Sequence, residues 1–307
     1  MRARMARERT SMSESSMASR AAPRVGLGIL AALAGILCLT LNDTFGKLLG
    51  EGYDSWQIVL ARSVLGLLPI LVVVRQQGGV SSLKVRSPLL HAVRAVCAVS
   101  AAYCFYEGLR HLALTECLAI TFAGPICTTA LSGPILKERV GARRWAVVTV
   151  GFAGVLLILR PGTSMFQPQA LWPLTATVSY SLMMVLTRVL ARTDSNAAIL
   201  VWNMVALALA ALPFTLRVWV TPAQADWIVF LLLGLSGAGA TYFLTVAYRH
   251  APAAVVAPLD YTALLWGLGL GWMIWRELPD PAIWPGVAVL VGAGLYLIRS
   301  ETRPGSG

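Results

Sequence analysis

The chain has 307 residues, of which 57% are hydrophobic and 13% are charged, and its formal net charge is +11. A soluble globular domain carries roughly 25% charged residues, so this composition excludes a soluble protein. The basic residues are scattered over six short segments rather than gathered in one patch, which argues against a nucleic-acid partner.

Ten apolar segments follow one another along the chain, separated by polar gaps that are too short to fold on their own. The hydrocarbon core of a bilayer is about 30 Å thick and needs roughly 20 helical residues. The pattern therefore predicts an all-α, polytopic membrane protein with the bilayer as its solvent. The predicted spans are Val25–Leu49, Trp56–Val74, Leu89–Leu109, Leu114–Leu136, Trp145–Leu159, Ala170–Leu186, Ala197–Phe214, Trp227–Tyr248, Pro252–Trp275 and Ala282–Ile298.

The distribution of basic residues predicts the orientation, because Lys and Arg are retained on the cytoplasmic side. With the amino terminus inside, 18 of the 25 Lys and Arg residues fall in cytoplasmic segments, five on the opposite side, and two within spans. Both termini are therefore expected in the cytoplasm, in a multi-pass protein of the bacterial cytoplasmic membrane. Residues 1–24 are expected to form a disordered basic tail, and residues 301–307 a second, shorter tail.

The sequence contains none of the enzyme or metal-site motifs considered next. All five cysteines lie within predicted spans and none forms a Cys-x-x-Cys pair, so disulfides and a metal site are both unexpected. The chain has no His-Glu-x-x-His, no paired Asp-rich motif and no Walker A sequence. We predict no enzymatic activity and no cofactor.

The chain repeats itself at a constant offset of 139 residues. Residues 100–145 align without a gap with residues 239–284 and share eight identities, among them Tyr103 with Tyr242, and Glu138 with Glu277. A duplicated unit of five helices explains this match. Because five is odd, the second copy enters the membrane from the opposite side, which is the inverted repeat of many carriers.

Several stretches resemble a known family. LKERVGARRWAVVTVGFAGVLLILRPG (136–162) and WRELPDPAIWPGVAVLVGAGLYLIRSE (275–301) are similar to the two EamA-type repeats of the drug/metabolite transporter superfamily. So are residues 115–138 and NDTFGKLL (42–49). The resemblance implies a first repeat over 25–162, a second over 163–300, and a central cavity for a small organic solute. One departure is Val147, where the family tends to carry the glycine found at Gly286.

Ionisable residues within spans are functional candidates, because a charge inside a bilayer costs several kcal/mol. Asp43 and Arg62 are expected about 10 and about 9 Å below the outer ends of their helices, and Lys47 one turn beyond Asp43. Arg94 and Asp260 are expected about 8 and about 12 Å from the cytoplasmic ends of theirs. These are two depth-matched sets of opposite charge, and each could neutralise itself or hold a zwitterionic solute. Purely structural ion pairing, with Lys47 extending outward, is the alternative.

Further residues are predicted to line the solute path. Asp260 lies in a ninth span that also contains Pro258 and several glycines, and this composition favours a break or a close helix approach. Asp260 is the candidate for proton coupling. Most aromatic residues in spans simply pack, and that reading stays open here. The predicted lining residues are Tyr103, Thr121, Tyr261 and Trp266.

Together these observations predict a secondary active transporter that works by alternating access. We expect export of an amino-acid-like or zwitterionic compound, for example an amino-acid derivative or an opine-type metallophore. Uptake of riboflavin or S-adenosylmethionine is the alternative, since subgroups of the resembling family do this. A channel and an intramembrane enzyme are less favoured. The expected partners are the solute, the lipid bilayer and, as coupling ion, the proton; a homodimer stays open.

Overall fold

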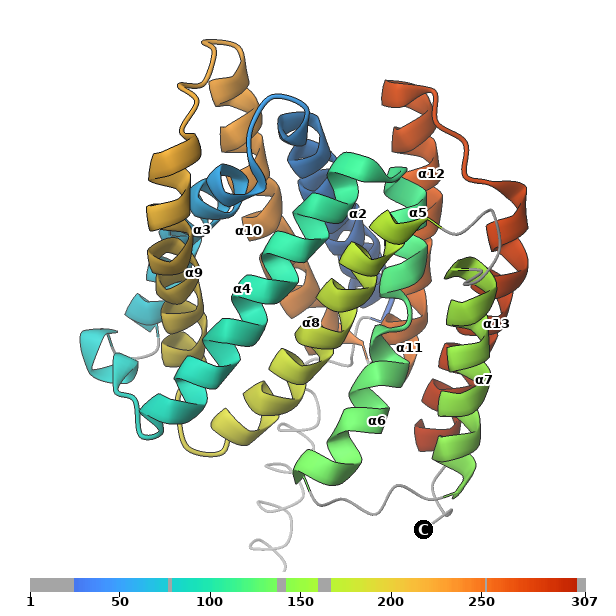
Figure 1. The fold of residues 1–307 in the computed structure, drawn as a ribbon. Helices are drawn as coiled ribbons and strands as arrows, with labels where there is room; N and C mark the ends of the chain where they lie inside the picture. The colour runs from blue at the N-terminus through green and yellow to red at the C-terminus, as the bar shows by residue number, and fades with distance from the viewer. Residues whose placement is uncertain (1–24, 77–78, 137–141, 160–166, 252, 303–307) are drawn as a thin grey trace, which may run out of the picture.

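The computed structural model describes residues 25–76, 79–136, 142–159, 167–251 and 253–302, and every regular element among them is helical (Figure 1). The predicted tail at 1–24 lies outside these residues. All ten predicted spans are confirmed as helices; eight are continuous and two are broken. The continuous ones are α2 (Val25–Gly50), α3 (Ser55–Gln76), α4 (Pro88–His111), α7 (Ala142–Leu159), α8 (Leu171–Leu190), α9 (Asn196–Val218), α10 (Asp226–His250) and α13 (Trp284–Thr302).

The two broken spans are the fourth and the ninth. The fourth consists of α5 (Leu114–Thr121) and α6 (Gly124–Leu136), and the ninth of α11 (Ala253–Val256), the 3₁₀ segment η3 (Ala257–Tyr261) and α12 (Thr262–Trp275). At the offset of 139, the break at Phe122 corresponds to the end of η3 at Tyr261. The rings of these two residues touch, with centroids 5.1 Å apart. The equivalent breaks of the two repeats therefore meet inside the bundle.

Helix packing repeats itself when the two halves are exchanged. α2 packs along α10, and α4 packs in the same way along α8. α3 pairs with α9, and α7 with α13, so each of these pairs joins equivalent helices. Figure 1 shows the α3–α9 pair on one side of the bundle and the α7–α13 pair on the other. This is the two-repeat architecture that the offset predicts.

Composition and length place the bundle in a membrane. Six of the described helices are long and apolar enough to cross a bilayer, and three shorter helices are also apolar. Large apolar side chains point outward, as Leu30, Leu209 and Leu216 do at 65–70% exposure. Such a surface would aggregate in water, whereas lipid solvates it and leaves the helical backbone internally hydrogen-bonded.

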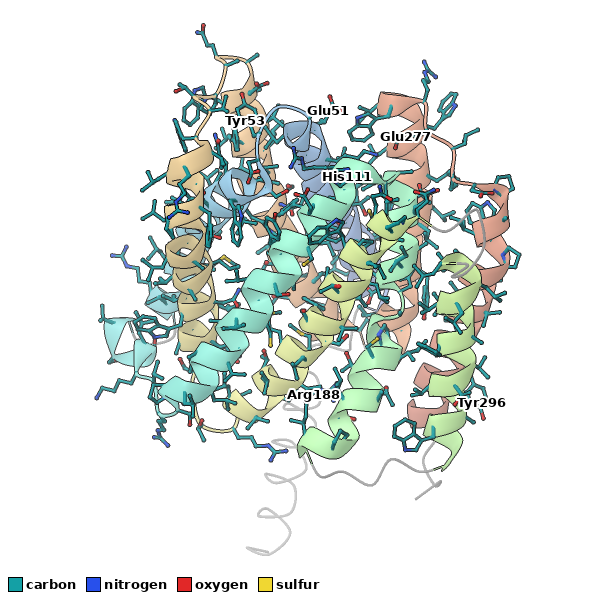
Figure 2. All side chains as sticks on the ribbon, viewed as in Figure 1. Glu51, Tyr53, His111, Arg188, Glu277 and Tyr296 are labelled. Atoms are coloured by element: carbon teal, nitrogen blue, oxygen red, sulfur yellow. The ribbon has the colours of Figure 1, made fainter. Side chains whose placement is uncertain are left out.

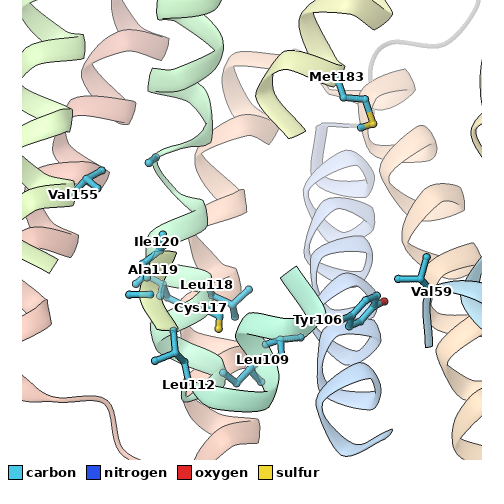
Figure 3. Close-up of a cluster of buried hydrophobic side chains, with 14 of the residues drawn as sticks. Val59, Tyr106, Leu109, Leu112, Cys117, Leu118, Ala119, Ile120, Val155 and Met183 are labelled. Carbon is cyan, nitrogen blue, oxygen red and sulfur yellow. The ribbon is translucent and has the colours of Figure 1, made fainter. Parts of the chain in front are cut away.

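The interior is closely packed where the repeats meet. Tyr106, Leu109 and Cys117 are almost fully buried in one cluster (Figure 3). Leu114 belongs to the same cluster. At the crossing of α7 and α13, a methyl group on Gly286 would lie only 2.8 Å from the carbonyl oxygen of Gly154. This close approach requires glycine. Val147 packs as a buried side chain elsewhere on α7, so the departure noted there does not loosen this crossing.

The membrane orientation is tested by fusing reporters to the connections. Fusions after Arg86 and Arg144 are expected to give cytoplasmic signals, because basic residues gather in those connections. Fusions after Glu51 and Gln167 should give external signals. Alkaline phosphatase and green fluorescent protein provide the paired readout, each active on one side only. A cytoplasmic signal at Gln167 would contradict the inverted arrangement.

Candidate functional site

The two ends of the bundle differ in the residues that they present. Figure 2 shows Glu51, Tyr53, His111 and Glu277 at one end, and Arg188 and Tyr296 toward the other. We refer to these as the outer and the inner end, following the predicted orientation. The predicted candidate residues lie on α2, α3, α4, α5 and the broken ninth helix.

Helix α2 brings a buried polar stripe into the apolar interior. Asn42, Asp43, Thr44 and Lys47 are all less than 9% exposed. The side-chain amide of Asn42 donates to the carbonyl oxygen of Leu233 on α10 at 2.6 Å, which ties α2 to the second repeat. The Asn42 Oδ1 atom is buried without a hydrogen-bond partner in the described structure. A buried polar atom without a partner is costly, so Asn42 is an expensive residue at this position of α2.

Arg62 and Asp43 lie close enough to interact electrostatically but do not form an ion pair within 4.0 Å. The Arg62 guanidinium instead donates to the Tyr106 hydroxyl at 3.1 Å and lies 5.8 Å from the centre of its ring. Tyr106 in turn packs on Gly46 of α2, where a methyl group would lie 2.2 Å from the ring. The position of Arg62 therefore depends on the absence of a side chain at residue 46.

This dependence predicts the effect of Gly46→Ala. Within a helix, replacement of Gly by Ala normally stabilises by about 1 kcal/mol. Here the new methyl group must displace the buried Tyr106 ring, so we expect a lower melting temperature and a loss of transport. Gly26→Ala on the same helix is the matched control, because nothing lies within 4 Å of the added methyl group. Equal melting temperatures of the two variants would contradict the role of this contact.

Lys47 has its bonding partners outside the predicted outer set, which consists of Asp43, Arg62 and Lys47 itself. Its ammonium donates to Glu277 Oε2 at 2.5 Å and to the carbonyl oxygen of Leu112 at 2.9 Å, and it lies 4.8 Å from the centre of the Trp275 ring. Lys47 therefore does not extend into lipid or water. It joins α2 of the first repeat to the end of α12 in the second.

Arg94 is 4% exposed and is surrounded by neutral groups. Its Nε atom donates to Thr187 Oγ1 at 2.6 Å, and Nη1 donates to Asn203 Oδ1 at 3.0 Å and to the Ile199 carbonyl oxygen at 3.5 Å. No carboxylate of the described residues pairs with it. These partners come from α8 and α9, so Arg94 links the first repeat to the second while keeping its charge.

Asp260 lies in the 3₁₀ segment η3 rather than in a regular α-helix, and it is exposed. Tyr180 of α8 lies near enough to Arg62, Asp260 and Arg94 to interact with them electrostatically. Tyr180 is 52% exposed. A ring within reach of charges on three other elements faces the space between the helices. Tyr180 is not among the residues predicted to line the solute path, although a tyrosine in the middle of a span is a signal that could have identified it.

The remaining predicted residues divide between packing and lining positions. Tyr103 stacks on Trp56 with ring centroids 4.3 Å apart and meets Trp172 edge-on at 6.0 Å. Thr121 donates to its own helix, to the Leu118 carbonyl oxygen at 2.7 Å. Tyr261 contacts Phe122 at the meeting of the two breaks, and Trp266 is 37% exposed on α12. Tyr261 thus lies where the two broken helices meet, whereas Tyr103 packs among tryptophan rings.

Polar loop contacts join the repeats at both ends. At the outer end Tyr53 donates to Asp226, and this hydrogen bond raises the pKa of the Tyr53 hydroxyl. At the inner end Asp194 lies 2.8 Å from His91 and accepts from the backbone of Arg86. Burial opposes ionisation of Asp194, but the hydrogen bonds from its neighbours outweigh it and lower the pKa of this carboxyl. The five cysteines are free, and no cluster of metal ligands occurs among the described residues.

Comparisons with known proteins agree with this architecture. The EamA-like transporter family matches residues 26–160 and 167–300. The S-adenosylmethionine uptake transporter of Rickettsia prowazekii (strain Madrid E) is 28% identical over 90% of this chain and 94% of its own. The pseudopaline exporter of Pseudomonas aeruginosa is 26% identical over 89% and 96%. A solved crystal structure has a TM-score of 0.58 at 18% identity, over 88% of this chain and 99% of that one.

The named relatives are bacterial transporters, and none of the features above is that of an enzyme. Two matched repeats, apolar helices and transporter relatives together identify a multi-pass protein of the bacterial inner membrane that transports small molecules. The chain belongs to the EamA-like transporter family of the drug/metabolite transporter superfamily.

Proposed function

We propose that the protein is a secondary active transporter that exports a small amino-acid-like or zwitterionic metabolite by alternating access. The observation that carries this proposal is the set of charges of both signs within the spans that form no ion pair with one another. Arg94 has only neutral hydrogen-bond partners, and neither Asp43 nor Asp260 forms an ion pair with a described residue. Arg62 donates to a tyrosine.

Interior charges of this kind are expensive. An arginine or aspartate at the centre of a membrane helix costs about 3 kcal/mol on insertion scales. If these charges served stability alone, pairing them with one another would lower that cost. A solute with both a carboxylate and a cationic group would instead supply the missing partners on the two sides. The charges therefore favour a zwitterion over a neutral or singly charged solute.

Two features support alternating access over a channel. The equivalent breaks of the two repeats meet at Phe122 and Tyr261, so bending at one break is transmitted directly to the other. The helix contacts also recur with the two repeats exchanged, so the α2–α10 pair has a counterpart in the α4–α8 pair. Rocking about such an interface exposes one site to either side in turn.

Uptake of S-adenosylmethionine is the second candidate function. It is favoured by the Rickettsia relative, whose name states uptake and which aligns over 90% of this chain. The interior charges suit this solute as well, because it bears an amino-acid head group and a further positive charge. The Pseudomonas relative, named as an exporter, supports the opposite direction. Direction is therefore the point on which the two candidates differ.

Counterflow in proteoliposomes tests the proposal. Purified protein is reconstituted, the vesicles are loaded with unlabelled compound, and entry of the labelled compound is followed. S-adenosylmethionine, histidine and riboflavin form the panel, the last being aromatic without a zwitterionic head group. A saturable overshoot with a zwitterion supports the proposal, and an overshoot with riboflavin alone contradicts the solute class. Linear, non-saturable entry would indicate a channel. Accumulation under a pH gradient of each polarity then assigns the direction.

A further inference from the structure

A pocket at the outer end lies directly beside the Lys47–Glu277 pair. Its volume is about 210 Å³, and its wall combines cationic, anionic and aromatic side chains. Lys47 and Glu277 belong to different repeats, and their side chains are 8% and 35% exposed. The lysine is thus the buried member of the pair, and the glutamate faces the pocket. The charged and aromatic residues of the wall are Lys47, Glu51, Arg110, His111, Trp275 and Glu277.

Two side-chain bonds fasten α2 to the end of α12 at this point. Besides the Lys47–Glu277 pair, Trp275 Nε1 donates to Glu51 Oε1 at 2.5 Å. Lys47 also binds the carbonyl oxygen of Leu112 between α4 and α5, so three separate elements converge on one ammonium group. The outer end cannot open between α2 and α12 unless both side-chain bonds break.

The backbone at the end of α12 holds Glu277 in place. Arg276 has a left-handed conformation with φ of 58°, and the amides of Arg276 and Glu277 donate back to Trp272 and Gly271. This termination motif normally uses glycine, so an arginine here adopts a conformation that side chains disfavour. Glu277 follows directly on this turn, and its carboxylate accepts from Lys47.

We infer that the Lys47–Glu277 pair, assisted by the Trp275–Glu51 bond, is the outer gate of the transporter, and that the pocket beside it is the vestibule of the solute path. This inference rests on the proposed alternating-access function. The gate is closed in this structure. When it opens, the separated ammonium and carboxylate present one partner to each charge of a zwitterionic solute. The gate thereby selects the same solute class as the interior charges.

A native cysteine reports on the state of this gate. Cys117 of α5 is fully buried in the cluster of Figure 3 and lies near enough to Lys47 and Glu277 to interact with them electrostatically. Replacing the other four cysteines by alanine leaves it as the single thiol. A membrane-impermeant reagent, 2-(trimethylammonium)ethyl methanethiosulfonate, is added to right-side-out vesicles. Its rate of reaction with Cys117 then measures how often the outer end opens.

Glu277→Gln and Lys47→Met should each raise the reaction rate about tenfold or more, which corresponds to about 1.4 kcal/mol. A change in local charge alone would act differently, because removing an anion favours the thiolate and removing a cation disfavours it. If the gate opens, the reaction rate of Cys117 should rise in both variants. Asp54→Asn is the control, since this carboxylate at the outer end lies 4.0 Å from Arg110 and both residues belong to the first repeat. Its rate should match that of the parent.

The reversed pair Lys47→Glu with Glu277→Lys should return the rate toward the parent value. Unchanged rates in both folded single variants, or a rise in one and a fall in the other, would overturn the gate. If the charge variants fail to fold, Trp275→Phe decides, because it keeps a ring near Lys47 and removes only the bond to Glu51. A rise in its rate supports the gate, and an unchanged rate rejects it. Counterflow measured in the same vesicles separates failure of the gate from failure of the proposed function.

Discussion

Asp260→Asn is expected to abolish accumulation driven by a pH gradient while leaving solute exchange measurable. The side chain lies in η3, beside the meeting point of the two broken helices, and it has no ion-pair partner among the described residues. A carboxyl group at a moving break can bind a proton in one state and release it in the other. Asparagine copies the shape of the protonated acid but cannot release the proton, so the coupling is lost and the exchange is kept.

Accumulation and exchange are measured on the same proteoliposomes, with and without the pH gradient. Asp226→Asn is the matched control, because this outer carboxylate accepts from Tyr53 and asparagine retains an acceptor oxygen. The Asp226→Asn variant should accumulate solute under the pH gradient as the parent does. Full gradient-driven accumulation in Asp260→Asn would remove this residue from the coupling mechanism.

A structural role for Asp260 makes a different prediction. If the carboxylate only neutralised Arg94, then Asp260→Asn would lower the folded yield and the further change Arg94→Leu would restore it. The observed partners of Arg94 are Thr187 and Asn203, so we expect no such rescue. Folded yield from size-exclusion chromatography of the three variants distinguishes the two roles.

The helices and the repeat were predictable because their signals are local or strictly periodic along the chain. The hydropathy of a segment indicates whether it lies in lipid or in water, and this signal does not depend on which helices are its neighbours. The breaks were partly predictable too. Pro258 lies in η3, as a ring that removes a backbone donor suggests, whereas Pro134 lies within an unbroken α6. A proline weakens a helix, and tertiary packing decides whether it breaks.

The partners of the charged residues could not be predicted in the same way. Depths calculated at 1.5 Å per residue assume a straight α-helix. The 3₁₀ turns of η3 change both the rise and the direction of the side chains, so a depth calculated for a straight helix does not apply to Asp260. Lys47 pairs with a residue 230 positions away, and Arg94 uses a threonine and an asparagine that look ordinary in the sequence. Both depend on how the repeats pack, and a single sequence does not contain that information explicitly.

Removing either Asp43 or Arg62 alone is expected to be more damaging than removing both. The two residues face each other electrostatically across α2 and α3, and each partly compensates the other. Removing one of two buried charges that compensate each other is destabilising, because the remaining charge loses its compensation. Asp43→Asn and Arg62→Met should therefore each lower folded yield and thermal stability. The double variant should recover part of that loss, with a coupling energy of about 0.5–3 kcal/mol.

Tyr106→Phe separates this coupling from the effect of the neighbouring hydrogen bond. The variant removes the hydroxyl that accepts from Arg62 and leaves both charges in place. Its stability loss should be about 1 kcal/mol, as for one hydrogen bond, and smaller than that of either charge variant. Additive losses in the Asp43 and Arg62 cycle would show that the two charges act separately. In that case the arginine would depend on Tyr106, and the aspartate would remain unpaired in the interior and available to the cationic group of a solute.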